Sequence, residues 1–295
     1  MVNIYEQINR NKIRSAFIVS LFSAFIVLVA YLITRAYNLD GTFIVFAILF
    51  SIVSSLSSYF YGDKMVLALN HAQPANKNNY PLLYQVIENL SIANQTPMPK
   101  IYIINTNAPN AFATGRDPQH AVVCVTTGLL PKLNRSELEA VIAHELSHIK
   151  NYDIRLMTLV SILIGSLSIL INMAYRSSFF RKSSDKENNQ ANNIIMLLGF
   201  IMIIFAPLIA QLIQLAISRR REYYADASAV KLTRQPQALI DALTKISEDD
   251  SPFQTASTAT ASLYITNPFK GNKIASLFST HPPIKDRIKS LQAMM

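Results

Sequence analysis

Four long apolar stretches constrain this chain more than any other feature of its sequence. They run from Ala16 to Thr34, from Thr42 to Phe60, from Leu156 to Tyr175 and from Ile194 to Ile217, and none contains Asp, Glu, Lys or Arg. Because a bilayer core of roughly 30 Å needs about 20 helical residues, each stretch has the length of a membrane span. A serine-rich end makes the second stretch the weakest. We therefore predict an α-helical membrane protein with four transmembrane helices.

The charge content of the chain agrees with this class. Only 15% of its 295 residues are charged, whereas a soluble domain carries about 25%. This composition excludes a disordered chain and argues against an ordinary cytosolic globule. The single cysteine, Cys124, excludes an intramolecular disulfide and a cysteine-rich zinc knuckle. The net charge is +9, but the basic residues follow the ends of the apolar stretches, which disfavours nucleic acid as a partner.

The basic residues beside the four stretches predict the orientation of the chain. One side of a four-span arrangement carries Arg10, Lys12, Arg14, Lys64, Lys150, Arg155, Arg219, Arg220 and Arg221, and the other carries Arg35, Arg176, Arg181, Lys182 and Lys186. Because cytoplasmic loops carry the excess of Lys and Arg, we expect both termini in the cytoplasm. The loop 176–193 is more basic than an exported loop prefers, which weakens this expectation.

The stretches divide the chain into four parts. Residues 1–61 form an N-terminal transmembrane hairpin, and residues 156–217 form a second one. The two hairpins are separated by residues 62–155, and the second hairpin is followed by residues 218–295. We expect these two parts to form one domain on the cytoplasmic side.

Hydrophobic periodicity predicts a mostly helical domain with a small sheet. Strands are expected at Lys100 to Asn105 and His120 to Thr127, with an edge strand at Asn110 to Gly115. Helices are expected at Asn79 to Gln95, from Asn134 onward, at Glu222 to Leu232, at Pro236 to Ser247 and after Pro282.

The helix that begins at Asn134 carries the chemistry. Glu137 completes a capping-box signature, and the helix continues into the sequence His144-Glu145-Leu-Ser-His148. Because residues four apart share one helix face, both imidazoles can bind the same Zn²⁺, and Glu145 can then reach water at the ion. The alternative is a surface helix with two chance histidines. The chain has only five histidines, so the spacing favours a zinc site.

A zinc site needs at least one further protein ligand. Downstream, Glu222 and Asp226 lie one helical turn apart, after three consecutive arginines. A membrane hairpin between them and His144 returns Glu222 to the side of the membrane that holds the histidines. We therefore expect Glu222 to be the third ligand and Asp226 to hold a zinc-bound histidine. The alternative is that Glu222 belongs to a solvated charge cluster with the arginines.

Four segments together resemble the HtpX family of bacterial membrane zinc metalloproteases, which are gluzincins in the same wider group as the CAAX prenyl proteases. The segments are Asn-Ala-Phe-Ala-Thr-Gly at 110–115, His-Glu-Leu-Ser-His at 144–148, Arg-Arg-Arg-Glu-Tyr-Tyr-Ala-Asp at 219–226 and Ser-Thr-His-Pro-Pro at 279–283. The resemblance implies a zincin-like α+β catalytic domain and one zinc ion held by His144, His148 and Glu222. It also implies that Glu145 is the catalytic base and that Asp226 supports the site without touching the metal.

The resemblance assigns further roles outside the ligand set. In relatives the Asn-Ala-Phe segment is an edge strand that binds substrate backbone, and this role carries over to Asn110, Ala111 and Phe112. An extended substrate would add to this edge through backbone groups, with little sequence preference.

Three residues near the expected site have less definite roles. His281 matches a family histidine with an expected transition-state role, although a helix cap before Pro282 explains it equally well. Tyr223 is a second candidate for stabilising the oxyanion. Arg287 matches a common arginine without an assigned role.

The family resemblance implies an endopeptidase of the bacterial inner membrane that takes part in quality control of misfolded membrane proteins. Its expected partners are membrane proteins or unfolded polypeptides as substrates, the lipid bilayer, and other quality-control proteases. Two alternatives stay open. One is a prenyl-protein processing protease, which usually encloses its site in more membrane helices, and the other is a non-enzymatic membrane scaffold. Metal analysis together with a cleavage assay separates an enzyme from a scaffold.

Overall fold

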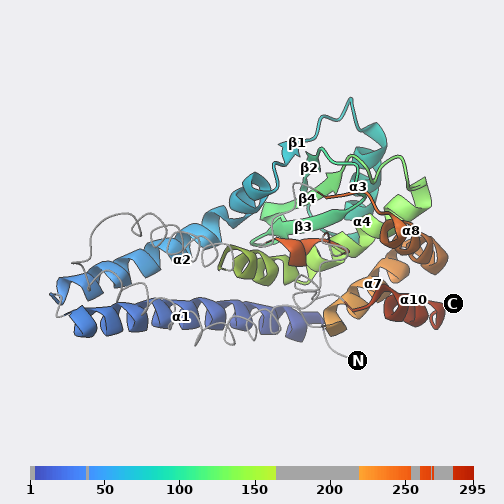
Figure 1. Ribbon diagram of the computed structural model, residues 1–295. Helices are drawn as coiled ribbons and strands as arrows, with labels where there is room; N and C mark the ends of the chain where they lie inside the picture. Colours follow the sequence, from blue (N-terminus) through green and yellow to red (C-terminus); the bar gives the residue numbers. More distant parts are fainter. Residues whose placement is uncertain (1–3, 38–39, 164–218, 254–259, 267, 269–281) are drawn as a thin grey trace.

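The computed structural model of the chain describes residues 4–37, 40–163, 219–253, 260–266, 268 and 282–295. Two long helices extend away from a mixed α+β domain (Figure 1). The elements are α1 (Ile4–Tyr37), α2 (Thr42–Leu69), β1 (Gln73–Pro74), α3 (Pro81–Asn94), β2 (Lys100–Ile104), β3 (Ala111–Gly115), β4 (Ala121–Thr126), α4 (Arg135–Lys150), α7 (Arg219–Thr233), α8 (Pro236–Glu248) and α10 (Ile284–Gln292). Short 3-10 turns lie at Pro118–His120 and Ala261–Leu263, and a further helix covers residues 153–163.

The first two apolar stretches lie in the two long helices. α1 contains the whole of the first stretch, and α2 begins where the second stretch begins. α2 continues beyond Phe60, because Val66 and Leu67 near its C-terminus are buried against the sheet. Asp63 and Lys64 end the apolar run without ending the helix, so hydropathy alone places the helix end too early.

Within the part of the chain that the structure describes, one helix has the length and apolarity of a membrane span. It covers Ile44–Leu69, and an 18-residue part of it has a mean hydropathy of 1.8 and is 12% buried. Phe46, Phe50 and Val53 are each at least 60% exposed, unlike the side chains of a soluble core helix. This apolar surface suits a lipid environment. Most of the third stretch, from residue 164, and all of the fourth lie outside the described residues, so the count of four spans stays a prediction.

The helix at residues 153–163 packs against both long helices. Its Leu156 is buried in a cluster with Ile18 of α1. On the other side, a Cβ on Gly62 of α2 would lie 2.7 Å from Ile162 Cδ1, so the two helices approach closely at this glycine. The described beginning of the third stretch is therefore helical and belongs to one bundle with α1 and α2.

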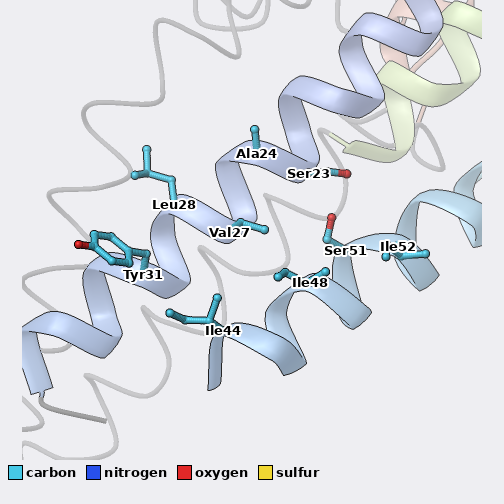
Figure 2. Close-up of a pocket in the computed structure, with 9 residues that line it drawn as sticks. All are labelled: Ser23, Ala24, Val27, Leu28, Tyr31, Ile44, Ile48, Ser51 and Ile52. Atoms are coloured by element: carbon cyan, nitrogen blue, oxygen red, sulfur yellow. The ribbon is translucent and has the colours of Figure 1, made fainter. Parts of the chain in front are cut away.

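Farther from the domain, α1 and α2 border an apolar groove of about 530 Å³ (Figure 2). Val27 and Tyr31 line it from α1 and Ile44 and Ile48 from α2. This lining suits lipid or a further apolar helix rather than a polar ligand.

The domain contains a four-stranded sheet of order β1-β2-β4-β3. β2 and β4 are parallel, while β1 pairs antiparallel with β2 and β3 pairs antiparallel with β4. β3 therefore lies at an edge of the sheet, as predicted for the segment Asn110 to Gly115. The strands predicted at Lys100 and at His120 are confirmed as β2 and β4, whereas the two-residue strand β1 was not predicted.

Both faces of the sheet are buried. Along β4, Val123 and Val125 face a core built with α3, α4, α7 and α8, and Val122 and Cys124 face a second core with the end of α2 and Tyr264. Burial in the second core raises the pKa of the Cys124 thiol, so this cysteine is a packing residue. The helices predicted for the domain are present as α3, α4, α7, α8 and α10. Of these, α4 packs directly against the sheet (Figure 1).

Candidate active site

The N-terminus of α4 is capped as its sequence predicts. The Asn134 side chain accepts a hydrogen bond from the Glu137 backbone N–H at 2.9 Å, and the Asn134 N–H donates to Glu137 Oε2 at 2.9 Å. Lys245 of α8 donates to both oxygens of the buried Glu137, at 2.8 and 2.7 Å. The cap thereby ties α4 to α8 and sets where the following turns of the helix begin.

Two turns further along α4, the rings of His144 and His148 face the same space. Their Nε2 atoms lie 3.2 Å apart, and both side chains are nearly fully buried. The spacing of four residues brings them to one helix face, as the sequence predicts. Glu145, the residue expected to act as base, is 2% exposed on the same turn.

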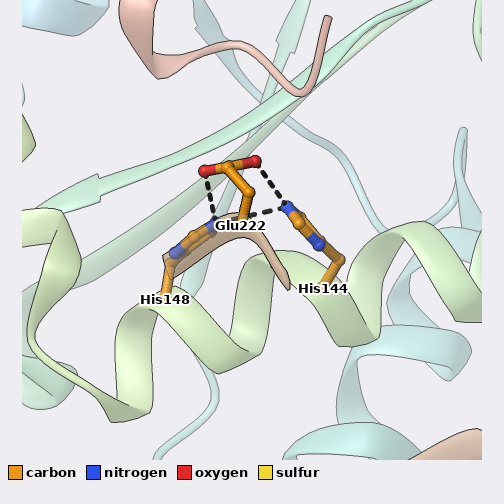
Figure 3. Close-up of side chains that lie close together, drawn as sticks. All are labelled: His144, His148 and Glu222. Carbon is orange, nitrogen blue, oxygen red and sulfur yellow. Dashed lines mark hydrogen bonds and ion pairs between the residues drawn. The ribbon is translucent and has the colours of Figure 1, made fainter. Parts of the chain in front are cut away.

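α7 supplies a carboxylate to this space. Glu222 Oε2 lies 3.7 Å from His144 Nε2, and Glu222 Oε1 lies 3.6 Å from His148 Nε2 (Figure 3). One ligand atom from each of the three residues lies within 4.8 Å of the others. The structure thus brings Glu222 to the two histidines across more than seventy residues of chain and excludes a solvent-exposed position for it.

The ligand atoms fit a zinc ion. Nitrogen ligands about 2.0–2.1 Å from a tetrahedral zinc lie about 3.3–3.4 Å from each other, which is close to the separation of the two Nε2 atoms. Two imidazoles and one carboxylate are also the donor set of a catalytic zinc site with an open fourth position. His144, His148 and Glu222 therefore form a candidate metal site.

Each histidine is held by an aspartate on its opposite ring nitrogen. His144 Nδ1 lies 2.9 Å from Asp226 Oδ1, and His148 Nδ1 lies 3.1 Å from Asp153 Oδ2. Because an ionised carboxylate only accepts, each Nδ1 carries the hydrogen, and this assignment leaves the Nε2 lone pairs for the metal. Asp226 thus contacts His144 on the ring nitrogen that faces away from the candidate metal site. Asp153 was not predicted from the sequence as a partner of the site, because no spacing rule marks it.

The charges around the site shift its pKa values in opposite directions. Burial would raise the pKa of Asp226, but the charge and hydrogen bonds of Arg287 lower it to about 2. Burial would lower the pKa of His148, but the hydrogen bond to Asp153 and the charges of Glu222 and Glu145 raise it to about 9. A metal ion must therefore displace a proton from the metal-free site near neutral pH.

Arg287 of α10 is the cation at the centre of these groups. It is fully buried and donates to both oxygens of Asp226, at 2.9 and 2.6 Å. A third bond reaches the backbone carbonyl of Ile265 at 3.1 Å, and Nη1 lies 3.7 Å from Glu222 Oε2. The sequence left Arg287 without a role, and the structure shows that it compensates the buried carboxylates on α7.

The edge strand β3 is in contact with another part of the chain. Asn110, Ala111 and Phe112 are at most 2% exposed. The Asn110 amide donates to the Thr266 carbonyl at 2.9 Å, and Ala111 O accepts from the Ile265 N–H at 3.0 Å. The side chains of these three residues therefore point into the protein, and backbone groups of the edge are the ones that suit the substrate-binding role that the resemblance implies.

Of the two candidates for oxyanion stabilisation, only Tyr223 lies within the described residues. Tyr223 is half-buried on α7, beside Glu222. His281 lies outside the described residues, so its expected role stays a prediction.

Comparison with known proteins identifies the family. Residues 77–295 match Peptidase family M48. The chain is 43% identical to the Protease HtpX homolog of Dictyoglomus turgidum over 290 residues, which cover 98% of this chain and 94% of that protein. It is 42% identical to the Protease HtpX homolog of Lactobacillus helveticus over 301 residues, with 99% and 100% covered. The crystal structure of S. mikatae Ste24p is similar with 20% identity and a TM-score of 0.49, covering 97% of this chain and 67% of that one.

The family and the geometry agree on the class of chemistry. A peptidase of this family is metal-dependent, and the chain places two histidines and a glutamate where one ion would touch all three. The chain therefore belongs to peptidase family M48, as a membrane metalloprotease related to HtpX.

Proposed function

We propose that this protein is a zinc-dependent endopeptidase of the bacterial inner membrane that hydrolyses peptide bonds in misfolded membrane proteins and unfolded polypeptides. The observation that carries the proposal is the buried set of His144, His148 and Glu222, in which both imidazoles present Nε2 to one point. A scaffold protein would have no use for a buried cluster of this kind, because taking ionisable groups out of water is costly.

Within this proposal, each residue of the site has a separate role. A zinc ion held by the three ligands supplies Lewis-acid polarisation of the scissile carbonyl and acidifies water. Glu145, buried beside His144, takes the proton from the attacking water and passes it to the leaving amine. Asp226 keeps the hydrogen of His144 on Nδ1, and Arg287 neutralises the charge that Asp226 and Glu222 bring into the interior. Tyr223 or His281 supplies a further donor to the oxyanion.

The proposed substrate class follows from the position of β3. An extended segment of substrate pairs with backbone groups of this edge strand other than the Ala111 carbonyl, which already accepts from Ile265. The strand lies close to α4 in the core. Pairing through the backbone gives little sequence preference, which suits removal of unfolded segments. Other quality-control proteases are proposed to act on the same substrates together with this protein.

We propose a four-span topology with both termini in the cytoplasm. The excess of Lys and Arg beside the domain supports this orientation. A reporter fused after Asn78, in an exposed loop, or after Met295 should read as cytoplasmic, and one at Asn188 should read as exported. A cytoplasmic reading at Asn188 would contradict a crossing hairpin between His148 and Glu222.

The chemical proposal is tested by removing the base while keeping the metal site. The Glu145→Gln variant of the purified full-length protein should retain one zinc per chain, lose casein cleavage and survive longer without self-cleavage, because the amide keeps the shape but cannot take a proton. Glu139→Gln makes the same change on the same helix, at a residue that pairs with Arg135, and should retain activity. His144→Ala should lose both zinc and activity. Substantial cleavage by Glu145→Gln would show that another group activates the water.

A further inference from the structure

A side chain of the first long helix reaches an aspartate beside the candidate metal site. Asn11 of α1 is 2% exposed, and its amide nitrogen donates to the Asn151 carbonyl at 3.0 Å and to Asp153 Oδ1 at 2.7 Å. These two acceptors lie on either side of the left-handed residue Tyr152, in the turn between α4 and the helix at residues 153–163. Asn11 therefore fixes the turn that immediately follows the zinc-binding helix.

The chemistry of the contact determines the orientation of the amide. The Asn151 carbonyl and the Asp153 carboxylate are both acceptors, so only the NH₂ end of Asn11 can face them. An amide nitrogen has two N–H groups, and the two bonds use both. The backbone carbonyl of Asn11 accepts in turn from the Ser15 hydroxyl at 2.9 Å, within the same turn of α1.

The aspartate that Asn11 holds is the one that orients a ligand. Asp153 Oδ1 accepts from Asn11 and lies 3.5 Å from Arg221 Nη1, while Oδ2 faces His148 Nδ1 at 3.1 Å. The carboxylate is 1% exposed and cannot rely on water for its remaining bonds. Its rotation, and with it the direction of the His148 ring, is thus fixed from opposite sides by α1, α7 and α4.

We propose that Asn11 is a positioning residue for the zinc site, which it orients through Asp153 and His148. The inference rests on the proposed zinc-dependent function. It makes α1 a part of the metal site, although none of its residues is a ligand. Without Asn11, the Asp153 carboxylate rotates toward Arg221, and His148 loses the partner that keeps Nε2 directed at the ion.

The test measures zinc affinity in the full-length protein, by competition with a chelator in detergent. Asn11→Leu keeps the shape of the side chain and removes both donors. It should weaken zinc binding about tenfold, at the lower end of the ~10–100-fold range for partners of metal ligands. Asn9→Leu makes the same change at an exposed position of α1 and should leave the affinity unchanged. The melting midpoint of each metal-free variant is recorded beside it, because a purely structural role would lower the midpoint and leave the affinity of the folded protein unchanged.

A double-mutant cycle tests the contact itself. In Asp153→Asn, two amides face each other across the contact, and zinc binding should fall. In the combined variant Asn11→Leu with Asp153→Asn, the loss of Asn11 should cost little further affinity, because Asn11 acts on the site through Asp153.

The outcomes separate the inference from the proposed function. If wild-type protein binds zinc and Asn11→Leu binds it equally well, the positioning role is overturned while the zinc peptidase stands. The same holds if Asn11→Leu weakens zinc binding as much in the Asp153→Asn protein as in the wild-type protein. If the wild-type protein binds no zinc, the proposed function itself fails and the inference fails with it.

Discussion

Replacing Arg287 with methionine tests whether the buried charge network holds the domain together. Arg287 is fully buried, and its closest ionic partner is Asp226, whose side chain is 1% exposed. The substitution keeps most of the length and apolar volume of the arginine stem and removes the charge. It leaves the Asp226 carboxylate with the His144 ring and without its cation.

The expected loss of stability is large. Removing one partner of a buried ion pair costs about 3–5 kcal/mol, because the other charge is left uncompensated in the interior. At about 2–4 °C per kcal/mol, the melting midpoint should fall by roughly 6–20 °C. In the variant, Asp226 also loses the interaction that lowers its pKa, so it should take up a proton at a higher pH than in the wild-type protein.

The measurement is thermal unfolding followed by circular dichroism in detergent at pH 7, with a chelator present so that changes in zinc affinity do not contribute. Lys285→Met removes a charge at an exposed position of the same helix and should change the midpoint little. Adding Asp226→Asn to Arg287→Met removes both charges and should recover part of the loss. A midpoint for Arg287→Met within about 2 °C of wild type would refute the reasoning, because it would mean a cost below about 1 kcal/mol.

Two further predictions concern packing and pH. Gly128→Ala should destabilise the domain by about 1–3 kcal/mol, because the added Cβ would lie 2.0 Å from the backbone oxygen of Asn107. Gly41→Ala is the control, because open space surrounds that glycine, and thermal unfolding of both variants measures the difference. Burial would raise the pKa of Asp249, but its bonds to Lys132 and Ser251 lower it to about 2 from an ordinary value of 3.8, so this carboxylate stabilises the fold above about pH 4 and the stabilisation is lost as the pH falls toward 2. Asp249→Asn should therefore cost at most about 1 kcal/mol at pH 7, since the pair is partly exposed, and less at pH 3; an equal cost at both values would contradict the assignment.

Local signals in the sequence were sufficient for most of the domain. The capping box of Asn134 and Glu137 predicted the start of α4, and the helical spacing then placed His144 and His148 on one face. Short apolar runs between turn residues predicted the strands. These signals work because each depends on neighbours within a few residues, which the sequence displays directly.

Features set by distant partners were not predictable in the same way. The two-residue strand β1 exists because Gln73 and Pro74 pair with β2, and nothing local distinguishes them from a loop. α2 continues past Phe60 because its end finds a surface on the sheet. The bond between Asn11 and Asp153 joins positions 142 residues apart, so no spacing rule could reveal it.

The metal site also depends on distant partners, and more strongly than its His-Glu-x-x-His motif suggests. The two histidines come from one helix, but an isolated helix with histidines four residues apart leaves both rings free to rotate and offers two ligands only. The candidate third ligand, Glu222, lies on α7. The ring of His144 contacts a carboxylate that α10 neutralises, and the ring of His148 contacts a carboxylate that accepts from α1. Zinc affinity therefore measures the assembly of the long N-terminal helix with both parts of the domain. Substitutions far from the His-Glu-x-x-His motif that disturb this assembly should weaken zinc binding before they alter any ligand.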